Sequence, residues 1–338
     1  MVAVPDPHPN LETVWQPGLT EFEAPPNFKA RIKESYDARA DQFNVWTTTQ
    51  NVQLRIHYVG ELIKLLKGED KKKGAAHGRD DKNKAGAHKY DDKSKVAARP
   101  LMRSSSRSGT GAAGAPAGLW GMHALDVGCG CGHPVLQMLV DEDIDTIGVD
   151  LSARQIAQAS ERFPRQIKSL QVVLAEQDMM DLRFPPAEFN MVVALFTLMH
   201  LERAEQTVFL NRAHRWLKPG GMLLFNFPQV ENEGRVLDQW HGKEAGWLFT
   251  SSWGQSMMME VIHRLDFEVL VEEVRGDGGV EVPNVVWVIA QKRKPPMEPK
   301  KEWVQRPREP SVGEAILLET PMTALSMMTP SDLGDEYY

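Results

Sequence analysis

The sequence predicts an α/β fold with one doubly wound, mostly parallel seven-stranded sheet and an antiparallel C-terminal hairpin. Three observations lead to this prediction. Short apolar runs alternate with segments of helical periodicity between residues 119 and 265, the first run leads into a glycine-rich loop, and the last two runs flank a short glycine turn. With 338 residues, 42% of them hydrophobic, the chain can bury one such core and still carry tails.

The N-terminal part is expected to be an arm followed by helices. Residues 1–28 are rich in proline and polar residues and lack periodicity, which is typical of an irregular arm. Residues 29–67 are expected to form helices that pack on the core, because one apolar face recurs at helical spacing in their second half. This face comprises Val52, Ile56, Val59, Leu62, Ile63 and Leu66.

Residues 68–118 interrupt this pattern. They hold 12 Lys or Arg against 6 Asp or Glu, a charge of +6, which leaves −13 for the rest of a chain whose formal charge is −7. With almost nothing apolar to bury, this basic insert is expected to be disordered. A solvated linker, a nuclear address and a contact with an acidic protein partner all fit it. The acidic remainder argues against a broad nucleic-acid surface.

The chain is organised around residues 123–133, where an apolar strand ends in a glycine-rich loop. Gly128, Gly130 and Gly132 permit positive φ and let the backbone approach a ligand closely. Asp126 places a carboxylate just before this loop. A ligand is therefore expected against the backbone at the carboxyl end of this strand.

Two ligand classes use such a loop, and the spacing separates them. The dinucleotide fingerprint needs a third glycine at position 133, where this chain has His133. The carboxylate of Asp126 would repel a pyrophosphate but attract an ammonium or sulfonium cation. S-adenosylmethionine carries both cations, so the loop favours this cofactor.

A second strand, residues 144–150, also ends in an acid. Asp150 is placed to accept hydrogen bonds from the two ribose hydroxyls of a nucleoside. The following helix is expected to start with a capping box of Ser152 and Gln155, which would fix Asp150 in position.

The pattern Leu125-Asp-Val-Gly-Cys-Gly-Cys-Gly132 together with Val149-Asp150 resembles the cofactor site of class I S-adenosylmethionine-dependent methyltransferases of the small-molecule type. The resemblance covers residues 29–67 and 119–291 and implies a Rossmann-like fold and S-adenosyl-L-methionine as cofactor. The residues that it implies for cofactor binding are Tyr36, Asp126, Gly128, Cys129, Gly130, Gly132, Asp150, Leu151, Asp178, Met179 and Phe196.

Tyr36 belongs to this set because residues 34–43 resemble the Tyr-Asp-x-x-Ala segment that precedes the core in small-molecule methyltransferases and folds over the cofactor. An aromatic side chain that only anchors a helix to the core explains Tyr36 equally well.

The third strand, residues 171–175, leads to a loop with Asp178. The resemblance implies that Asp178 meets the adenine amino group and that the amide of Met179 meets a ring nitrogen. A carboxylate that only caps a turn is the alternative for Asp178.

The fourth strand, residues 190–196, is apolar throughout, as a parallel sheet covered on both faces requires. Nucleobase amino-methylating enzymes carry an Asn/Asp/Ser-Pro-Pro-aromatic motif here, whereas this chain has Ala194-Leu-Phe-Thr-Leu-Met-His200, so nucleobase acceptors are not expected. Residues 217–221, Leu-Lys-Pro-Gly-Gly, are a further resemblance and are expected to separate a helix from the fifth strand, residues 222–227.

Residues 228–252 are expected to be a long loop that covers the substrate. The aromatic and imidazole side chains of this lid, which Trp253 would extend into the next helix, are Trp240, His241, Trp247 and Phe249. Strands at 267–274 and 282–289 should form the antiparallel hairpin. Residues 292–338 show no sustained period, so a largely disordered tail is expected.

The two cysteines, Cys129 and Cys131, lie two positions apart in the glycine loop and cannot form an unstrained disulfide. They fit a reducing compartment, and we expect them to fill a tight loop and to bind no metal. No run is long enough to span a bilayer, so a cytoplasmic location is expected, with the nucleus open because of the insert.

We expect an enzyme that moves a methyl group from S-adenosylmethionine to an oxygen, nitrogen or carbon atom of a small molecule by in-line displacement. His200 and His241 are the candidate bases. Two alternatives stay open: a protein or RNA acceptor docked by residues 68–118, and a non-enzymatic regulator that acts through its tails.

Overall fold

The computed structural model describes residues 15–17, 22–49, 52–68, 121–238, 246–276 and 284–295. Expectations for most of the arm, the basic insert and the C-terminal tail, and for Trp240 and His241, lie outside the described residues. The helices and strands all belong to one compact unit, Met1–Lys294, and the description below concerns this unit.

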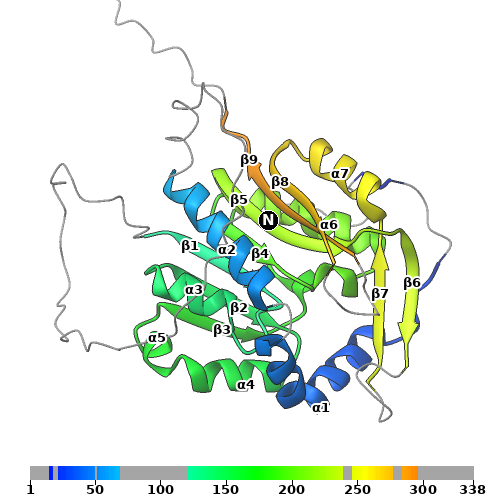
Figure 1. Ribbon diagram of the computed structural model, residues 1–338, viewed down its shortest axis with the longest axis horizontal. Helices are drawn as coiled ribbons and strands as arrows, with labels where there is room; N and C mark the ends of the chain where they lie inside the picture. Colours follow the sequence, from blue (N-terminus) through cyan, green and yellow to red (C-terminus); the bar gives the residue numbers. More distant parts are fainter. Residues whose placement is uncertain are drawn as a thin grey trace, which may run out of the picture. The chain divides into compact units, whose positions relative to one another are not determined.

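One seven-stranded sheet forms the centre of the unit, as the sequence predicts (Figure 1). Its order is β3-β2-β1-β4-β5-β9-β8, and β9 alone runs antiparallel to its neighbours. In chain order the strands are β1 (His123–Val127), β2 (Asp145–Asp150), β3 (Val172–Glu176), β4 (Phe189–Ala194), β5 (Leu217–Pro228), β8 (Phe267–Arg275) and β9 (Val285–Lys292).

Helices cover both faces of this sheet. One face packs against α2 (Val52–Lys67) and α3 (Val135–Asp141), and the other against α6 (Arg203–Trp216) and α7 (Gly254–Arg264). Strand β4 shows why its sequence is apolar throughout. Met191 and Val193 pack toward the α2 face, while Val192 and Ala194 pack toward the α6 face.

Two helices lie at the β3 side. Helix α4 (Ala153–Arg162) contacts β2 and β3, and the short α5 (Pro164–Lys168) follows it. Phe163, between the two helices, is fully buried against α3 and β3. None of the described helices is long and apolar enough to cross a membrane.

The start of β5 differs from the prediction. The strand begins at Leu217, directly after α6, so the Lys-Pro-Gly-Gly run lies within it instead of before it. The pairing with β4 shifts from Phe189↔Leu217 to Met191↔Met222, so the extra residues form an irregularity in the strand. Gly220 supplies the positive φ of +82° that this irregularity requires.

The region expected to be a lid loop is also different. It contains β6 (Asn232–Leu237) and β7 (Leu248–Ser252), which pair antiparallel as a separate two-stranded sheet. All five residues of β7 are buried, so this strand is part of the packed interior and is not an exposed loop.

The aromatic residues near β7 divide between two cores. Trp247 and Phe249 pack with Ile32 of α1 (Phe28–Thr49), which agrees with the expected aromatic cluster. The prediction that Trp253 extends this cluster is wrong. Trp253 packs in the core under α6, and its Nε1 donates to the carbonyl of Arg203 at 2.8 Å. Figure 1 shows α1 between α4 and β7.

Candidate functional site

A pocket opens at the carboxyl ends of β1, β2 and β4, with an empty volume of ≈ 1050 Å³ that includes open solvent at its mouth. Helices α1 and α2 and the loops after β1 to β4 provide its walls. Of the candidates from the sequence, those that line it are Tyr36, Asp126, Gly128, Cys129, Gly130, Asp150, Leu151, Asp178, Met179, Phe196 and His200. Gly132 is not among its lining residues, and His241 lies outside the described residues.

The glycine loop is fastened to β2 by its own backbone. The N–H groups of Gly128 and Cys129 both donate to the carbonyl of Val149, at 2.8 and 3.0 Å. Gly128 has φ +72°, and a Cβ there would lie 2.6 Å from Oγ1 of Thr197. A side chain at this position would therefore displace the loop that follows β4.

Gly132 serves packing instead of facing the pocket. Its φ is +81°, and a Cβ would lie 2.5 Å from Cε2 of Phe163. The third glycine thus lets α3 and the buried Phe163 come together behind the pocket.

The carboxylate of Asp150 is held by backbone N–H groups on both of its oxygens. Oδ2 accepts from Gly130 at 2.8 Å and Oδ1 accepts from Ser152 at 2.9 Å. Only half of the predicted capping box forms: Ser152 Oγ accepts from the N–H of Gln155 at 3.1 Å, but the Gln155 side chain has no partner among the described residues. In a complete capping box the Gln155 side chain would accept from the N–H of Ser152, but here Asp150 accepts from it. Asp150 therefore links the end of β2 to the start of α4.

Asp126 brings an uncompensated acceptor into the pocket. Its side chain is buried, and Oδ2 has no hydrogen-bond partner among the described residues. Burial, and secondarily the charge of Asp150, raises the pKa of Asp126 to about 8, while Arg55 acts in the opposite direction. A buried acceptor in this state is suited to a ligand that brings a positive charge.

Tyr36 and His200 form a hydrogen-bonded pair across the pocket. Tyr36 Oη lies 3.0 Å from His200 Nε2, and His200 Nδ1 lies 2.9 Å from the carbonyl oxygen of Phe249 in β7. Because a carbonyl can only accept, Nδ1 carries the proton, and Nε2 accepts from the Tyr36 hydroxyl.

The pKa values of this pair move in opposite directions. Burial lowers the pKa of His200, although its hydrogen bond to the carbonyl of Phe249 opposes this. Burial and the charge of Asp150 raise the pKa of the Tyr36 hydroxyl. The imidazole is therefore neutral, and the phenol protonated, near neutral pH.

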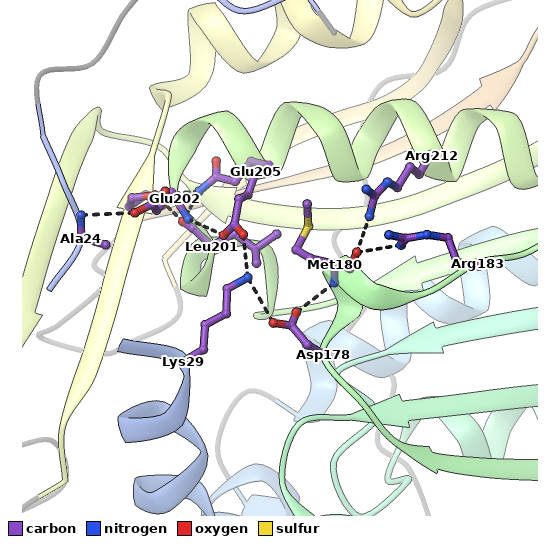
Figure 2. A network of polar contacts seen from close by, with 11 residues as sticks. Ala24, Lys29, Asp178, Met180, Arg183, Leu201, Glu202, Glu205 and Arg212 are labelled. Carbon is purple, nitrogen blue, oxygen red and sulfur yellow. Dashed lines mark hydrogen bonds and ion pairs between the residues drawn. The ribbon is translucent and has the colours of Figure 1, made fainter. Parts of the chain in front are cut away.

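Asp178 lies in the loop after β3, and each of its two carboxylate oxygens has a partner (Figure 2). Oδ1 accepts from the N–H of Met180 at 2.9 Å, which caps a short 3₁₀ turn at Met179–Asp181, as the alternative interpretation expected. Oδ2 forms an ion pair with Lys29 of α1 at 3.1 Å. Asp178 is thus a turn cap that also lines the pocket.

Arg55 is a pocket residue that the sequence analysis missed. Its side chain is buried, lines the pocket and places its guanidinium 4.9 Å from the ring centre of Phe196. A signal was present, since Arg55 follows Val52 by three residues and precedes Val59 by four, which puts a charge on the predicted apolar face.

Phe196 itself has φ +57°, an uncommon conformation for an aromatic residue. Its N–H donates to Oδ1 of the buried Asn226 at 2.6 Å, which supports this backbone geometry. The strand end is therefore turned so that its aromatic ring lines the pocket.

Both cysteines of the glycine loop are free and buried. Burial and the charges of Asp150 and Asp126 raise the pKa of the Cys129 thiol well above its ordinary value. This thiol is therefore protonated and unreactive, which fits a space-filling role in the loop.

Residues 124–221 match a family model described as a methyltransferase domain. The chain is 34% identical over 103 residues to a 27-O-demethylrifamycin SV methyltransferase of Amycolatopsis mediterranei, covering 30% of this chain and 37% of that protein. It is 32% identical over 104 residues to phosphoethanolamine N-methyltransferase 3 of Arabidopsis thaliana, covering 31% and 20%. The matched segment thus spans well under half the length of these relatives.

One solved structure agrees over most of the chain. It is the 1,6-didemethyltoxoflavin-N1-methyltransferase of Burkholderia thailandensis with bound 1,6-didemethyltoxoflavin and S-adenosylhomocysteine. The TM-score is 0.50 at 13% identity, covering 82% of this chain and 94% of that one. At this identity the likeness concerns the fold alone.

Proposed function

We propose that this chain is a class I, S-adenosylmethionine-dependent methyltransferase, which transfers a methyl group from S-adenosylmethionine to an oxygen, nitrogen or carbon atom of a small molecule; the match of residues 124–221 to a methyltransferase domain supports this. The single observation that carries this proposal is the pair of acid-bearing strand ends around the glycine loop. Asp126 and Asp150 end adjacent parallel strands, and both line the pocket.

The residues of the pocket fit this cofactor. Oδ2 of Asp126, which has no hydrogen-bond partner among the residues that the structure describes, is suited to the ammonium group, because this group would bring a positive charge to the buried carboxylate. The carboxylate of Asp150 accepts backbone N–H groups and has lone-pair capacity left for a ribose hydroxyl. Gly130, with φ +54°, leaves the floor between them open to backbone approach.

The chemistry that the bound cofactor supplies is a methyl carbon already activated by a sulfonium centre. The protein has to orient the acceptor in line with that carbon and to exclude water. Tyr36 and Phe196, on α1 and after β4, are aromatic walls suited to both tasks.

Proton transfer can use the Tyr36–His200 pair. An acceptor that loses a proton can pass it to Oη of Tyr36, while the Tyr36 proton moves to Nε2 of His200. The Phe249 carbonyl would hold the resulting imidazolium through Nδ1–H. His200 is therefore our candidate base, acting through Tyr36.

The names of the relatives support a small-molecule acceptor, because their printed substrates are a rifamycin and phosphoethanolamine. We also propose a cytoplasmic location, which is supported by the two free cysteines of the described chain.

Calorimetric titration with S-adenosylhomocysteine, S-adenosylmethionine and NAD tests the proposal. Wild type should bind both adenosyl ligands and not NAD, and Asp150→Ala should lose at least tenfold in affinity (~1.4 kcal/mol) because the ribose hydroxyls lose a charged partner. Asp145→Ala is the matched control, since Asp145 is exposed at the other end of the same strand. Absence of adenosyl binding in wild type, or equal binding by both variants, would contradict the assignment.

A further inference from the structure

The ammonium group of Lys29 lies between two carboxylates from different parts of the fold. Nζ is 3.1 Å from Oδ2 of Asp178, which follows β3, and 2.6 Å from Oε1 of Glu205, in the first turn of α6. Figure 2 shows Lys29 reaching from α1 toward both carboxylates. Lys29 therefore joins three elements at the rim of the pocket.

Each carboxylate is first fixed by its own element. Glu205 and Glu202 form the capping box of α6, and Glu202 also accepts the N–H of Ala24 at 3.2 Å. Asp178 caps the turn through the N–H of Met180, whose carbonyl in turn accepts from Arg183 at 2.9 Å and from Arg212. Lys29 thus binds two groups that are already held in place (Figure 2).

The charges of the cluster depend on Lys29. Burial raises the pKa of Glu205, Lys29 lowers it, and the negative charge of Asp178 raises it again. Burial disfavours the charged form of Lys29, but Glu205 and Asp178 outweigh this and raise its pKa. Without the ammonium, two partly buried carboxylates would repel each other, and Oδ2 of Asp178 would lose the contact with Lys29 that fixes it.

Asp178 lines the pocket and can still accept hydrogen bonds from a ligand there. Its oxygens have spare lone pairs but, when ionised, no proton to give. The neighbouring Met179 also lines the pocket, and its main chain carries an N–H donor. An acceptor beside a donor matches a purine edge with an amino group next to a ring nitrogen, and it repels a purine with a carbonyl oxygen in place of the amino group.

We propose that Lys29 is a positioning residue that holds the Asp178 carboxylate in one orientation, so that the pocket selects 6-aminopurine over 6-oxopurine ligands. This inference rests on the proposed function, since it concerns the base of the cofactor. It adds a residue of α1, far from the strand-end motifs in sequence, to the determinants of cofactor choice.

The test compares S-adenosylhomocysteine with S-inosylhomocysteine by calorimetry. Wild type should prefer the adenosyl ligand, and Lys29→Met should reduce the ratio of the two affinities at least about tenfold, the effect of one charge-assisted hydrogen bond. Lys29→Arg, which keeps the charge, should retain most of the preference.

Lys33→Met is the matched control. Lys33 lies one turn further along α1 and pairs with Glu176 at 2.6 Å, but neither residue lines the pocket. Lys33→Met should leave the adenosyl-to-inosyl ratio unchanged, even if it weakens both ligands. Residual binding of either ligand by Lys29→Met would show that this variant folds.

Two results would overturn the inference: an absence of adenosyl preference in wild type, or a Lys29→Met variant that weakens both ligands by the same factor. The second result would mean that Lys29 only fastens α1. A wild type that binds neither ligand would contradict the proposed function itself, and the inference would fall with it.

Discussion

The Asp126 carboxylate is buried, and its Oδ2 has no hydrogen-bond partner within the described part of the chain, so this group can hold a proton. With a pKa of about 8, it is mostly protonated at pH 7. A cationic ligand group favours the ionised form and should expel this proton.

We therefore predict that S-adenosylhomocysteine binding at pH 7 releases close to one proton per site. The measurement is calorimetry in two buffers of different ionisation enthalpy. Asp126→Asn should bind more weakly and release none. Equal proton release by the variant and wild type would show that Asp126 is not the group that titrates.

Asp126 should also cost stability in alkaline solution. Its folded pKa lies above the unfolded value, so its contribution is favourable at low pH and is lost as the pH rises through about 8. Asp126→Asn should therefore unfold at a higher temperature than wild type at pH 9, by ~3 °C for about 1 kcal/mol, and the difference should shrink toward pH 6. Thermal scans across this range would refute the prediction if the difference were constant.

The Tyr36–His200 pair gives a prediction that needs no acceptor. Imidazole resonances of His200 should titrate below the ordinary histidine value of 6.5. Tyr36→Phe removes the hydroxyl that donates to neutral Nε2, so the titration midpoint should move upward. NMR titration with His200→Gln for assignment measures this, and an unmoved midpoint would mean that the hydroxyl does not stabilise the neutral ring.

At the scale of elements, α1 behaves as a strap across two strand ends. Charged residues recur every four positions along one face, at Lys29, Lys33, Asp37 and Asp41. Lys29 and Lys33 reach the loop after β3 and the end of β3, while Asp37 and Asp41 reach the start of α4.

Asp37 makes the densest of these contacts. Oδ1 accepts from Ser152 Oγ at 2.5 Å and from the N–H of Arg154 at 3.1 Å, next to Asp150. Although burial opposes ionisation, these hydrogen bonds and Lys33 lower the pKa of Asp37.

We predict that Asp37→Ala speeds S-adenosylhomocysteine dissociation about tenfold and increases amide exchange along α1, because one anchor of the strap is lost. Stopped-flow kinetics and hydrogen exchange would measure both effects. Glu61→Ala, which removes an exposed ion pair with Lys64 in α2, should change neither. If Asp37→Ala lowered the unfolding temperature but left the dissociation rate of S-adenosylhomocysteine unchanged, the contact would contribute to stability alone and the prediction would be wrong.

Elements with local signals could be predicted from the sequence, and those made by distant contacts could not. The seven strands, the glycine loop and Asp150 follow from periodicity and from acids at strand ends. The β6–β7 sheet was missed because β7 is buried on every residue and shows no alternation. The Lys29–Glu205 contact joins residues 176 positions apart, and no local pattern indicates it.

At the scale of the whole molecule, the basic insert joins two points away from the pocket. Lys67, at the end of α2, pairs with Glu142 at 2.7 Å, and the N–H of Asp145 donates to the carbonyl of Met122 at 3.1 Å. The chain thus leaves α2 near the amino ends of β1 and β2, whereas the pocket lies at their carboxyl ends.

Replacement of residues 69–118 by a flexible linker of ~15 residues should therefore leave S-adenosylhomocysteine affinity within about twofold of wild type. Calorimetry on the shortened chain tests this. A tenfold loss would mean that the insert takes part in the cofactor site, and the partner role proposed for it would have to be reconsidered.

The tautomer of His200 is set by the main chain of β7, through the carbonyl of Phe249, and not by a side chain. Every amino acid at position 249 brings the same carbonyl, so mutation of the β6–β7 hairpin can exchange its side chains and still keep Nδ1 protonated. Substitutions in the hairpin that keep its pairing would therefore leave the hydrogen bond between Tyr36 and His200 as it is. What inheritance has to preserve there is the register of the strand, since a slip of one residue would turn this carbonyl away.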